Sequence, residues 1–214
     1  MLSLPDHPRI DKDALIGGCV RLSVAVDAVR IAAEVQAIPQ DLWGNRGGGR
    51  IGVHRPAEAI FLRGFAPADG ELPIEDRDAL QCVPTIRELI ERVIPAIPMR
   101  CLIAKLRAGA VIAPHVDVPD YFAKTVRLHF PIVTHPSVRM FANGLWYHMQ
   151  PGEAWALNNS NLHAVVNGWD QPRVHVICDF LPSPQLLRLL SEGDRNLGRP
   201  DAQATGTLAA PAQY

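Results

Sequence analysis

The chain has 214 residues, of which 48% are hydrophobic and 20% are charged, and its formal net charge is −1. This length and composition predict a single domain with a sizeable core, at residues 20–196, after an N-terminal leader at 1–19. The near-neutral charge argues against general affinity for nucleic acid or anionic membranes. No apolar run is long enough to span a membrane, and the first residues lack a signal-peptide pattern, so we expect a cytoplasmic protein.

The first half of the chain mixes strand and helix patterns. Residue spacing predicts, in order, a strand, a helix, a glycine-rich loop, two short strands and a helix that Pro95 ends. Their ranges are 20–24, 26–36, 41–52, 51–54, 59–63 and 84–94. The loop has no phosphate-binding pattern, because its glycines between 44 and 52 lack the Gly-Lys-Ser/Thr ending of a P-loop.

The second half is a succession of short strands separated by turn residues. The predicted strands are 101–106, 125–133, 138–142, 145–149, 153–157, 164–166 and 174–180. Asn143-Gly144 is a strong hairpin signal between two of them. This pattern predicts a mainly β fold, a double-stranded β-helix (jelly-roll, cupin-like) barrel with flanking α-helices and its core at 101–182. The tail at 197–214 lacks periodicity and is expected to be disordered.

His115-Val116-Asp117 is the most informative segment of the chain. On an extended strand, residues two apart point to the same side, so His115 and Asp117 can reach one metal ion together. His163 follows at the mouth of a later strand, and Arg173 opens the next one. Two imidazoles and a carboxylate can occupy one face of an octahedral ferrous ion and leave the other positions open. A buried arginine such as Arg173 needs an anion.

Residues from about 101 to 182 resemble the aspartyl/asparaginyl β-hydroxylase family of Fe(II)- and 2-oxoglutarate-dependent oxygenases, which includes bacterial proline hydroxylases. The resemblance lies in residues 113–117, 126–130, 149–155, 161–163 and 173–179. It implies that His115, Asp117 and His163 hold the iron and form the catalytic centre. Asp117 favours the bacterial amino-acid hydroxylases, because the animal enzymes lack this carboxylate.

The resemblance also identifies residues for the co-substrate. It implies that Arg173 pairs with the distal carboxylate of 2-oxoglutarate, and that Arg127 and His129, as the Arg-x-His of the family, are directed at the same molecule. One departure is visible, because the animal enzymes carry a serine where this chain has Ala104. Another side chain must therefore help Arg173.

Other polar residues are weaker candidates, each with a plain alternative. His54 and Arg63 lie in the variable amino-terminal part, where they would contact a substrate carboxylate or belong to a lid. Arg139 and Trp146 are further candidates for substrate contact. For each of these residues alone, a solvated polar side chain is the better interpretation, and only together are they candidates for substrate recognition. His115 and Asp117 could likewise be a purely structural pair.

The resemblance implies a dioxygenase that uses Fe(II), 2-oxoglutarate and O2 to hydroxylate an unactivated C–H bond, with release of succinate and CO2. The substrate is a free amino acid such as proline, or an aspartyl or asparaginyl residue in a peptide or on a carrier. The short chain favours a small substrate. Two alternatives stay open: a cupin-type metalloenzyme that does not use 2-oxoglutarate, and a non-catalytic metal-dependent barrel that binds a small molecule.

Overall fold

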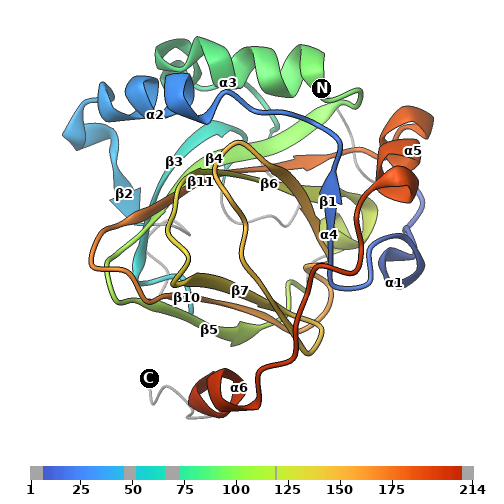
Figure 1. Cartoon of the computed structure of the whole chain (residues 1–214). Coiled ribbons are helices and arrows are strands. Elements are labelled where there is room, and N and C mark those ends of the chain that lie inside the picture. Colours follow the sequence, from blue (N-terminus) through green and yellow to red (C-terminus); the bar gives the residue numbers. More distant parts are fainter. Residues whose placement is uncertain (1–6, 46–51, 66–72, 119, 209–214) are drawn as a thin grey trace.

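The computed structural model describes residues 7–45, 52–65, 73–118 and 120–208, and within them two antiparallel sheets face each other (Figure 1). The larger sheet has the strand order β1 (Cys19–Leu22), β9 (Ala154–Leu157), β6 (Val126–Val133), β11 (Arg173–Phe180), β4 (Pro98–Leu106), β3 (Ala57–Arg63) and β2 (Gly44–Asn45). The smaller sheet has the order β5 (Val111–His115), β10 (His163–Asn167), β7 (Val138–Ala142) and β8 (Leu145–Tyr147). The predicted jelly-roll barrel is confirmed.

Helices cover the outer face of the larger sheet, with α2 and α3 over β3 and β4 in Figure 1. The helical segments are α1 (Lys12–Leu15), α2 (Ala28–Gln36), η1 (Gln40–Leu42), η2 (Asp78–Cys82), α3 (Pro84–Glu88), η3 (Leu89–Val93), α4 (Asp120–Lys124), α5 (Pro184–Glu192) and α6 (Ala202–Leu208). Their apolar faces and the outward side chains of the sheet form the main core, in which Ile31, Ile86, Leu186 and Phe130 are fully buried. This core stabilises the larger sheet from its outer face, so polar groups can occupy positions on its inner face.

Local sequence signals set the ends of these helices. Asp27 caps α2 by accepting a hydrogen bond of 3.0 Å from the backbone N–H of Arg30. Ser183 caps α5 in the same way, with Pro184 in the first turn. The predicted helix at 84–94 is α3 continued by the π-helical turn η3, and it ends before Pro95, which cannot continue a helix.

Several expectations from the sequence need correction. The strand predicted at 51–54 is wrong, because 52–56 form tight turns closed by hydrogen bonds of 3.0 Å from Arg55 to Gly52 and from Ala57 to His54. The loop predicted at 41–52 contains η1 and β2, and its residues 46–51 lie outside the described residues. The Asn143-Gly144 turn is confirmed, with positive φ at both positions.

The two ends of the chain are more structured than predicted. The tail contains α6, which Asp201 caps at the N–H of Ala204 and which buries Leu208 beneath the smaller sheet (Figure 1). Disorder is therefore the wrong prediction for 202–208, whereas 209–214 lie outside the described residues. The predicted leader contributes α1, whose Lys12 is buried. In the ranges that the structure describes, no helix has the length and apolar character that a bilayer-spanning segment requires.

Candidate metal and co-substrate site

His115 and His163 come together because their strands pair. His115 ends β5, His163 begins β10, and the two residues are register partners with ring centroids 4.1 Å apart. Each Nδ1 lies 2.9 Å from a backbone carbonyl oxygen two positions earlier, that of Ala113 or Asn161. A carbonyl only accepts hydrogen bonds, so Nδ1 carries a proton, and in the neutral ring Nε2 presents its lone pair. Burial, together with the neighbouring His115, lowers the pKa of His163 to about 4, which keeps that ring neutral.

Asp117 completes the set of three predicted ligands on the same side of the barrel. Its backbone N–H donates to the carbonyl of Asn159 at 3.0 Å, which ties it to the segment before β10. Its Oδ1 lies 3.9 Å from Nε2 of His115. The Asp117 carboxylate thus lies next to His115, whose ring in turn lies next to that of His163.

Arg127 orients the Asp117 carboxylate. Its Nη1 lies 2.6 Å from Oδ2 of Asp117, to which Asn159 Nδ2 also donates at 2.9 Å. The other side of the guanidinium makes a bidentate pair with Asp179 of β11, at 2.8 and 3.0 Å. Burial alone would raise the pKa of Asp117, but Arg127 and His163 outweigh burial and hold it well below its usual range. Asp117 is therefore an anion with one oxygen fixed by hydrogen bonds.

This arrangement differs from the one predicted for Arg127. The family resemblance predicts that Arg127 contacts the co-substrate. In the structure its Nε, Nη1 and Nη2 all contact the carboxylates of Asp117 and Asp179. The observed contacts make Arg127 a positioning residue for Asp117. Its side chain also lines the inner cavity, so a co-substrate contact stays a prediction. His129, two positions further on β6, lines the same cavity.

The predicted leader contributes a buried cation behind this network. Nζ of Lys12 donates to Oδ1 of Asn159 at 2.6 Å, and the Asn159 amide in turn holds Asp117. Burial, followed by the nearby Arg127, lowers the pKa of Lys12 to about 8. The sequence reading missed Lys12 and Asn159, and neither carries a local pattern that would reveal the contact. Asp179 was also missed, although its strand alternation places it on the same face as Arg173.

Arg173 lies fully buried on the inner face of β11, 1% exposed. Its Nη2 is 2.7 Å from Nδ1 of His175, and since a guanidinium only donates, that imidazole nitrogen is the acceptor. Burial, aided by Arg173, lowers the pKa of His175 well below its usual range. Arg173 shares one cavity with the predicted ligands His115 and His163. The position compared with the family serine, Ala104, is buried in an apolar cluster on this inner face.

His54 is the unexpected member of the site. From the turn before β3 it meets the His115 ring edge-on, with centroids 4.8 Å apart. Among the described residues, the ligand atoms of His54, His115 and Asp117 lie within 4.8 Å of one another. The sequence treated His54 only as a weak substrate contact. The structure places it beside the predicted metal ligands.

The other three weak candidates lie away from this cavity. Arg63 forms an ion pair with Asp76 and donates from Nε to the carbonyl of Pro98 at 3.0 Å. Arg139 and Trp146 lie on the outer face of the smaller sheet, where α6 covers them. Arg139 pairs with Asp201 at 2.7 Å, and the indole N–H of Trp146 donates to Thr205 at 3.1 Å. Arg139 and Trp146 thus contact α6 rather than the cavity, and substrate contact stays a prediction for both.

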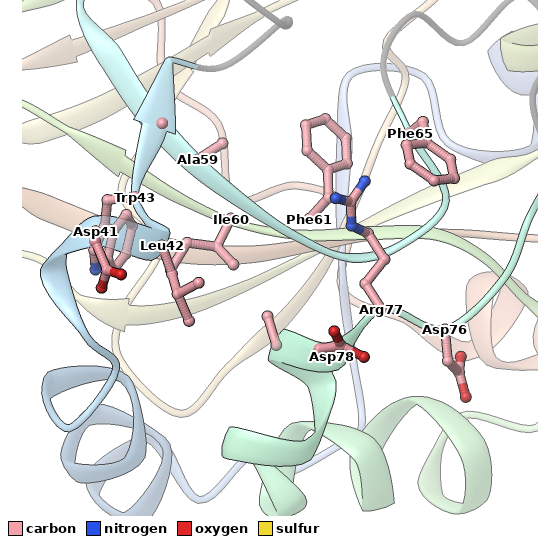
Figure 2. A pocket seen from close by; sticks show the side chains of 12 residues that line it. Asp41, Leu42, Trp43, Ala59, Ile60, Phe61, Phe65, Asp76, Arg77 and Asp78 are labelled. Atoms are coloured by element: carbon pink, nitrogen blue, oxygen red, sulfur yellow. The ribbon is translucent and has the colours of Figure 1, made fainter.

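A larger pocket of about 580 Å³ opens at the β2 and β3 edge of the larger sheet (Figure 2). Trp43, Phe61, Phe65 and Arg77 line it, with the Arg77 guanidinium 4.3 Å from the Phe65 ring centroid. Phe61 lies on β3, whose inner face also carries Ala59 of the cluster around Ala104. The pocket is thus next to the barrel interior.

Comparisons with known proteins agree with this geometry. A family model described as Aspartyl/Asparaginyl beta-hydroxylase matches residues 69–182, which is more than half of the chain. No curated protein matches the sequence. An oxidoreductase of the 2OG-Fe(II) oxygenase family from Burkholderia pseudomallei has a similar structure, with a TM-score of 0.54 and 13% identity over 94% of this chain and 100% of that chain.

Two further solved structures are similar at the same level. One is a prolyl hydroxylase from Trichoplax adhaerens in complex with a hypoxia inducible factor peptide fragment, with a TM-score of 0.51 and 13% identity over 85% of this chain and 90% of that one. The other is the alpha ketoglutarate dependent epimerase SnoN from nogalamycin biosynthesis, with a TM-score of 0.52 and 12% identity over 77% and 76%. At these identities the likeness shows a shared fold.

Proposed function

Because this chain belongs to the aspartyl/asparaginyl β-hydroxylase family, we propose that it is a hydroxylase that uses Fe(II), 2-oxoglutarate and O2 to act on an amino acid, free or within a peptide. The observation that carries the proposal is one cavity that two of the three predicted metal ligands and a buried cation line together. His115 and His163 line it together with Arg173, and Asp117 lies against its wall residue Arg127.

The donor set fits a ferrous ion. Two neutral imidazoles and one carboxylate are the ligands of the facial arrangement that non-haem Fe(II) oxygenases use, and they leave coordination positions for other molecules. The carbonyls of Ala113 and Asn161 hold both rings in the Nε2-binding tautomer. Asn159 and Arg127 fix Oδ2 of Asp117, so Oδ1 is the oxygen next to His115. His163, Asp117 and His115 would hold the metal.

Arg173 fits the far carboxylate of the co-substrate. A guanidinium that is 1% exposed requires an anion or several acceptors, and a bidentate carboxylate supplies both charge and orientation. His175 accepts from Nη2 and keeps the guanidinium in place from behind. His175 is thereby our candidate for the helper that replaces the family serine at Ala104. Ala104 itself packs in the inner apolar cluster and has no polar side-chain atom to offer Arg173.

When bound, Fe(II) and 2-oxoglutarate would supply the oxidation, in which O2 converts 2-oxoglutarate to succinate and CO2 and delivers one oxygen atom to a substrate C–H bond. The residues of the chain position the reactants and exclude water. The apolar part of the cavity wall is formed by Ile112, Leu157, Val165 and Ile177. Such a wall protects a reactive site from solvent.

An amino acid or peptide substrate agrees with the family and with the neighbouring folds. The prolyl hydroxylase structure contains a peptide fragment, and the family model is named for aspartyl and asparaginyl hydroxylation. The pocket in Figure 2 would admit a side chain or a short peptide next to the barrel interior. We therefore place the substrate on the β3 side of the metal ligands.

The test is succinate formation. Purified protein would be incubated with Fe(II), 2-oxoglutarate and O2, alone and with L-proline, L-asparagine or N-acetyl-L-aspartamide, and succinate would be followed by NMR. We expect succinate that requires iron and O2 and that one probe accelerates, and we expect His163→Ala to abolish it. His135→Ala is the matched control, because His135 lies in an exposed loop stacked on Trp169. Bound iron without any succinate would favour the cupin-type alternative.

A further inference from the structure

Arg100 is a cation on the inner face of the larger sheet that the proposed chemistry does not use. It lies on β4 two positions before Leu102, which belongs to the inner apolar cluster. Three aromatic rings surround its guanidinium, with centroid distances of 5.8 Å to Phe61, 5.6 Å to Tyr121 and 5.5 Å to Phe122. Each ring presents a weakly negative face to the cation.

The described residues provide Arg100 with no carboxylate. They contain no ion pair of this side chain, and its Nε is fully buried without a hydrogen-bond partner. Arg127 on the inner face and Arg63 at the end of β3 both have acidic partners. Burial lowers the pKa of Arg100, and the nearby Asp179 offsets this only in part. A half-buried guanidinium with a buried Nε, no ion pair and only partial compensation by a distant carboxylate is a strong site for an anion.

The fold makes room for Arg100 in this position. Gly64, after β3, has a φ of +67°, and a Cβ there would lie 2.9 Å from Cγ of Arg100. The backbone N–H of Arg100 donates to the Tyr121 hydroxyl at 3.1 Å, which ties the aromatic residue to the strand. Tyr121 is itself buried, so the aromatic enclosure is fixed from both sides.

Arg100 also lies beside the metal-ligand network, at the end of the barrel opposite Arg173. In the pairing of β4 with β11, Arg173 faces Leu106, whereas Arg100 falls between the Cys101–Cys178 and Pro98–Phe180 pairs, across from Asp179. Phe122 contacts both guanidinium groups, with Cζ of Arg127 4.6 Å from its ring centroid. Phe61 also lines the pocket of Figure 2.

We propose that Arg100 binds a carboxylate of the substrate. This inference rests on the proposed function and assigns the second anion of the site, because Arg173 serves the co-substrate at the other end. One guanidinium matches one carboxylate in bidentate geometry, and the aromatic rings keep the pair away from competing water. The carboxylate is either the α-carboxylate of a free amino acid or the side-chain carboxylate of a peptidyl aspartate.

The test is calorimetric binding of matched ligands to the protein loaded anaerobically with Fe(II) and 2-oxoglutarate. L-Proline against L-prolinamide probes an α-carboxylate, and N-acetyl-L-aspartamide against N-acetyl-L-asparaginamide probes a side-chain carboxylate. We expect one carboxylate to bind more tightly than its amide in the wild type. Arg100→Met should weaken that carboxylate by about 10- to 100-fold and leave the amide unchanged, because a charged hydrogen-bonded contact is lost. Arg100→Lys should retain part of the preference.

Arg188→Met is the control, since Arg188 is an exposed cation on α5 that pairs with Glu192, and it lies outside both the pocket and the aromatic rings around Arg100. It should bind both ligands of a pair as the wild type does. The proposal is overturned if neither carboxylate is preferred in the wild type, or if the preference survives in Arg100→Met. Failure of the proposed function is separate, because succinate would then be absent from the wild type while the carboxylate preference can still be read in this titration.

Discussion

The two faces of the larger sheet have opposite character, although the same strands supply both. On β11, Val174, Val176 and Phe180 point outward into the helix-covered core, whereas Arg173 and Asp179 point into the barrel. Residues one step apart along a strand therefore serve either stability or the site. The outer face is filled by apolar packing, and the inner face keeps several buried charged or polar groups that the fold alone does not require.

The buried ion pairs on the inner face orient the site rather than stabilise the fold. Buried ion pairs seldom stabilise a protein relative to apolar packing, because desolvation offsets their attraction. The Asp117–Arg127–Asp179 chain is nevertheless fully connected, and Lys12 and Asn159 extend it. Its contribution is orientation of the Asp117 carboxylate. Substitutions on the two faces should therefore separate stability from metal binding.

The largest expected effect is that of Asp117→Ala on the inner face. Loss of a ligand should weaken Fe(II) binding by more than the roughly 10- to 100-fold that outer partners of a metal site contribute, and turnover should disappear. The fold should be retained, as judged by circular dichroism. Asp201→Ala is the control, because Asp201 caps α6 and pairs with Arg139, away from the predicted metal ligands. Wholesale unfolding of Asp117→Ala would contradict an open catalytic site.

Phe130→Ala makes the opposite change on the outer face. Phe130 is fully buried between β6 and the covering helices, so its removal should lower the free energy of unfolding by about 3 to 5 kcal/mol. Urea unfolding measures this loss. Calorimetry at low temperature, where the variant stays folded, should give wild-type Fe(II) affinity. A weakened Fe(II) affinity in the folded variant would show that the two faces are coupled.

Asp179→Asn should affect both properties. The change leaves the buried Arg127 with Asp117 as its one full carboxylate partner, which should cost about 3 kcal/mol of unfolding free energy. Arg127 would then be free to change its hydrogen-bond geometry with Asp117. Because this alters the orientation of a metal ligand, Fe(II) affinity should also fall by about 10- to 100-fold. Urea unfolding and Fe(II) calorimetry give the two values. Wild-type Fe(II) affinity in this variant would contradict a role of Asp179 in orienting Asp117 and would leave it a purely structural role.

The smallest expected effect is a pH dependence from Lys12. Its pKa is about 8 in the folded protein and near 10.5 when unfolded, so between these values the unfolded chain binds more protons and stability rises with pH. The unfolding free energy of the wild type minus that of Lys12→Met should therefore increase from pH 8 to pH 10, by about 1 to 3 kcal/mol. Urea titrations across this range test it, and a flat difference would contradict a buried, desolvated Lys12.

The sequence predicted what local patterns determine. Strand alternation and turn residues predicted the barrel. Of the residues predicted for the site, His115, His163 and Arg173 line one cavity, and Asp117 pairs with Arg127 in its wall. The roles of these residues remain predictions. His54 was underestimated, because its place beside His115 depends on a turn rather than on a periodic element.

Long-range contacts account for the remaining misses. Lys12 reaches Asn159 across 147 positions of the chain, and nothing near either residue indicates the partner. The α6 helix is stabilised by tertiary contacts, because Leu208 packs against Trp146 of the smaller sheet and Thr205 accepts a hydrogen bond from its indole N–H. Composition alone does not reveal these contacts. Arg100 likewise gains meaning only when Phe61 and Phe122 surround it.

The most direct test of the account is an anaerobic titration of the metal-free protein with Fe(II) and then 2-oxoglutarate, followed by visible absorption. A keto acid chelated to ferrous iron has a charge-transfer band, and we predict that this band appears and that Arg173→Met shifts its formation to much higher 2-oxoglutarate concentrations. Arg63→Met, which removes a half-buried cation away from the cavity, should leave the titration unchanged. Bound iron with no band, or a band that Arg173→Met does not affect, would contradict the account.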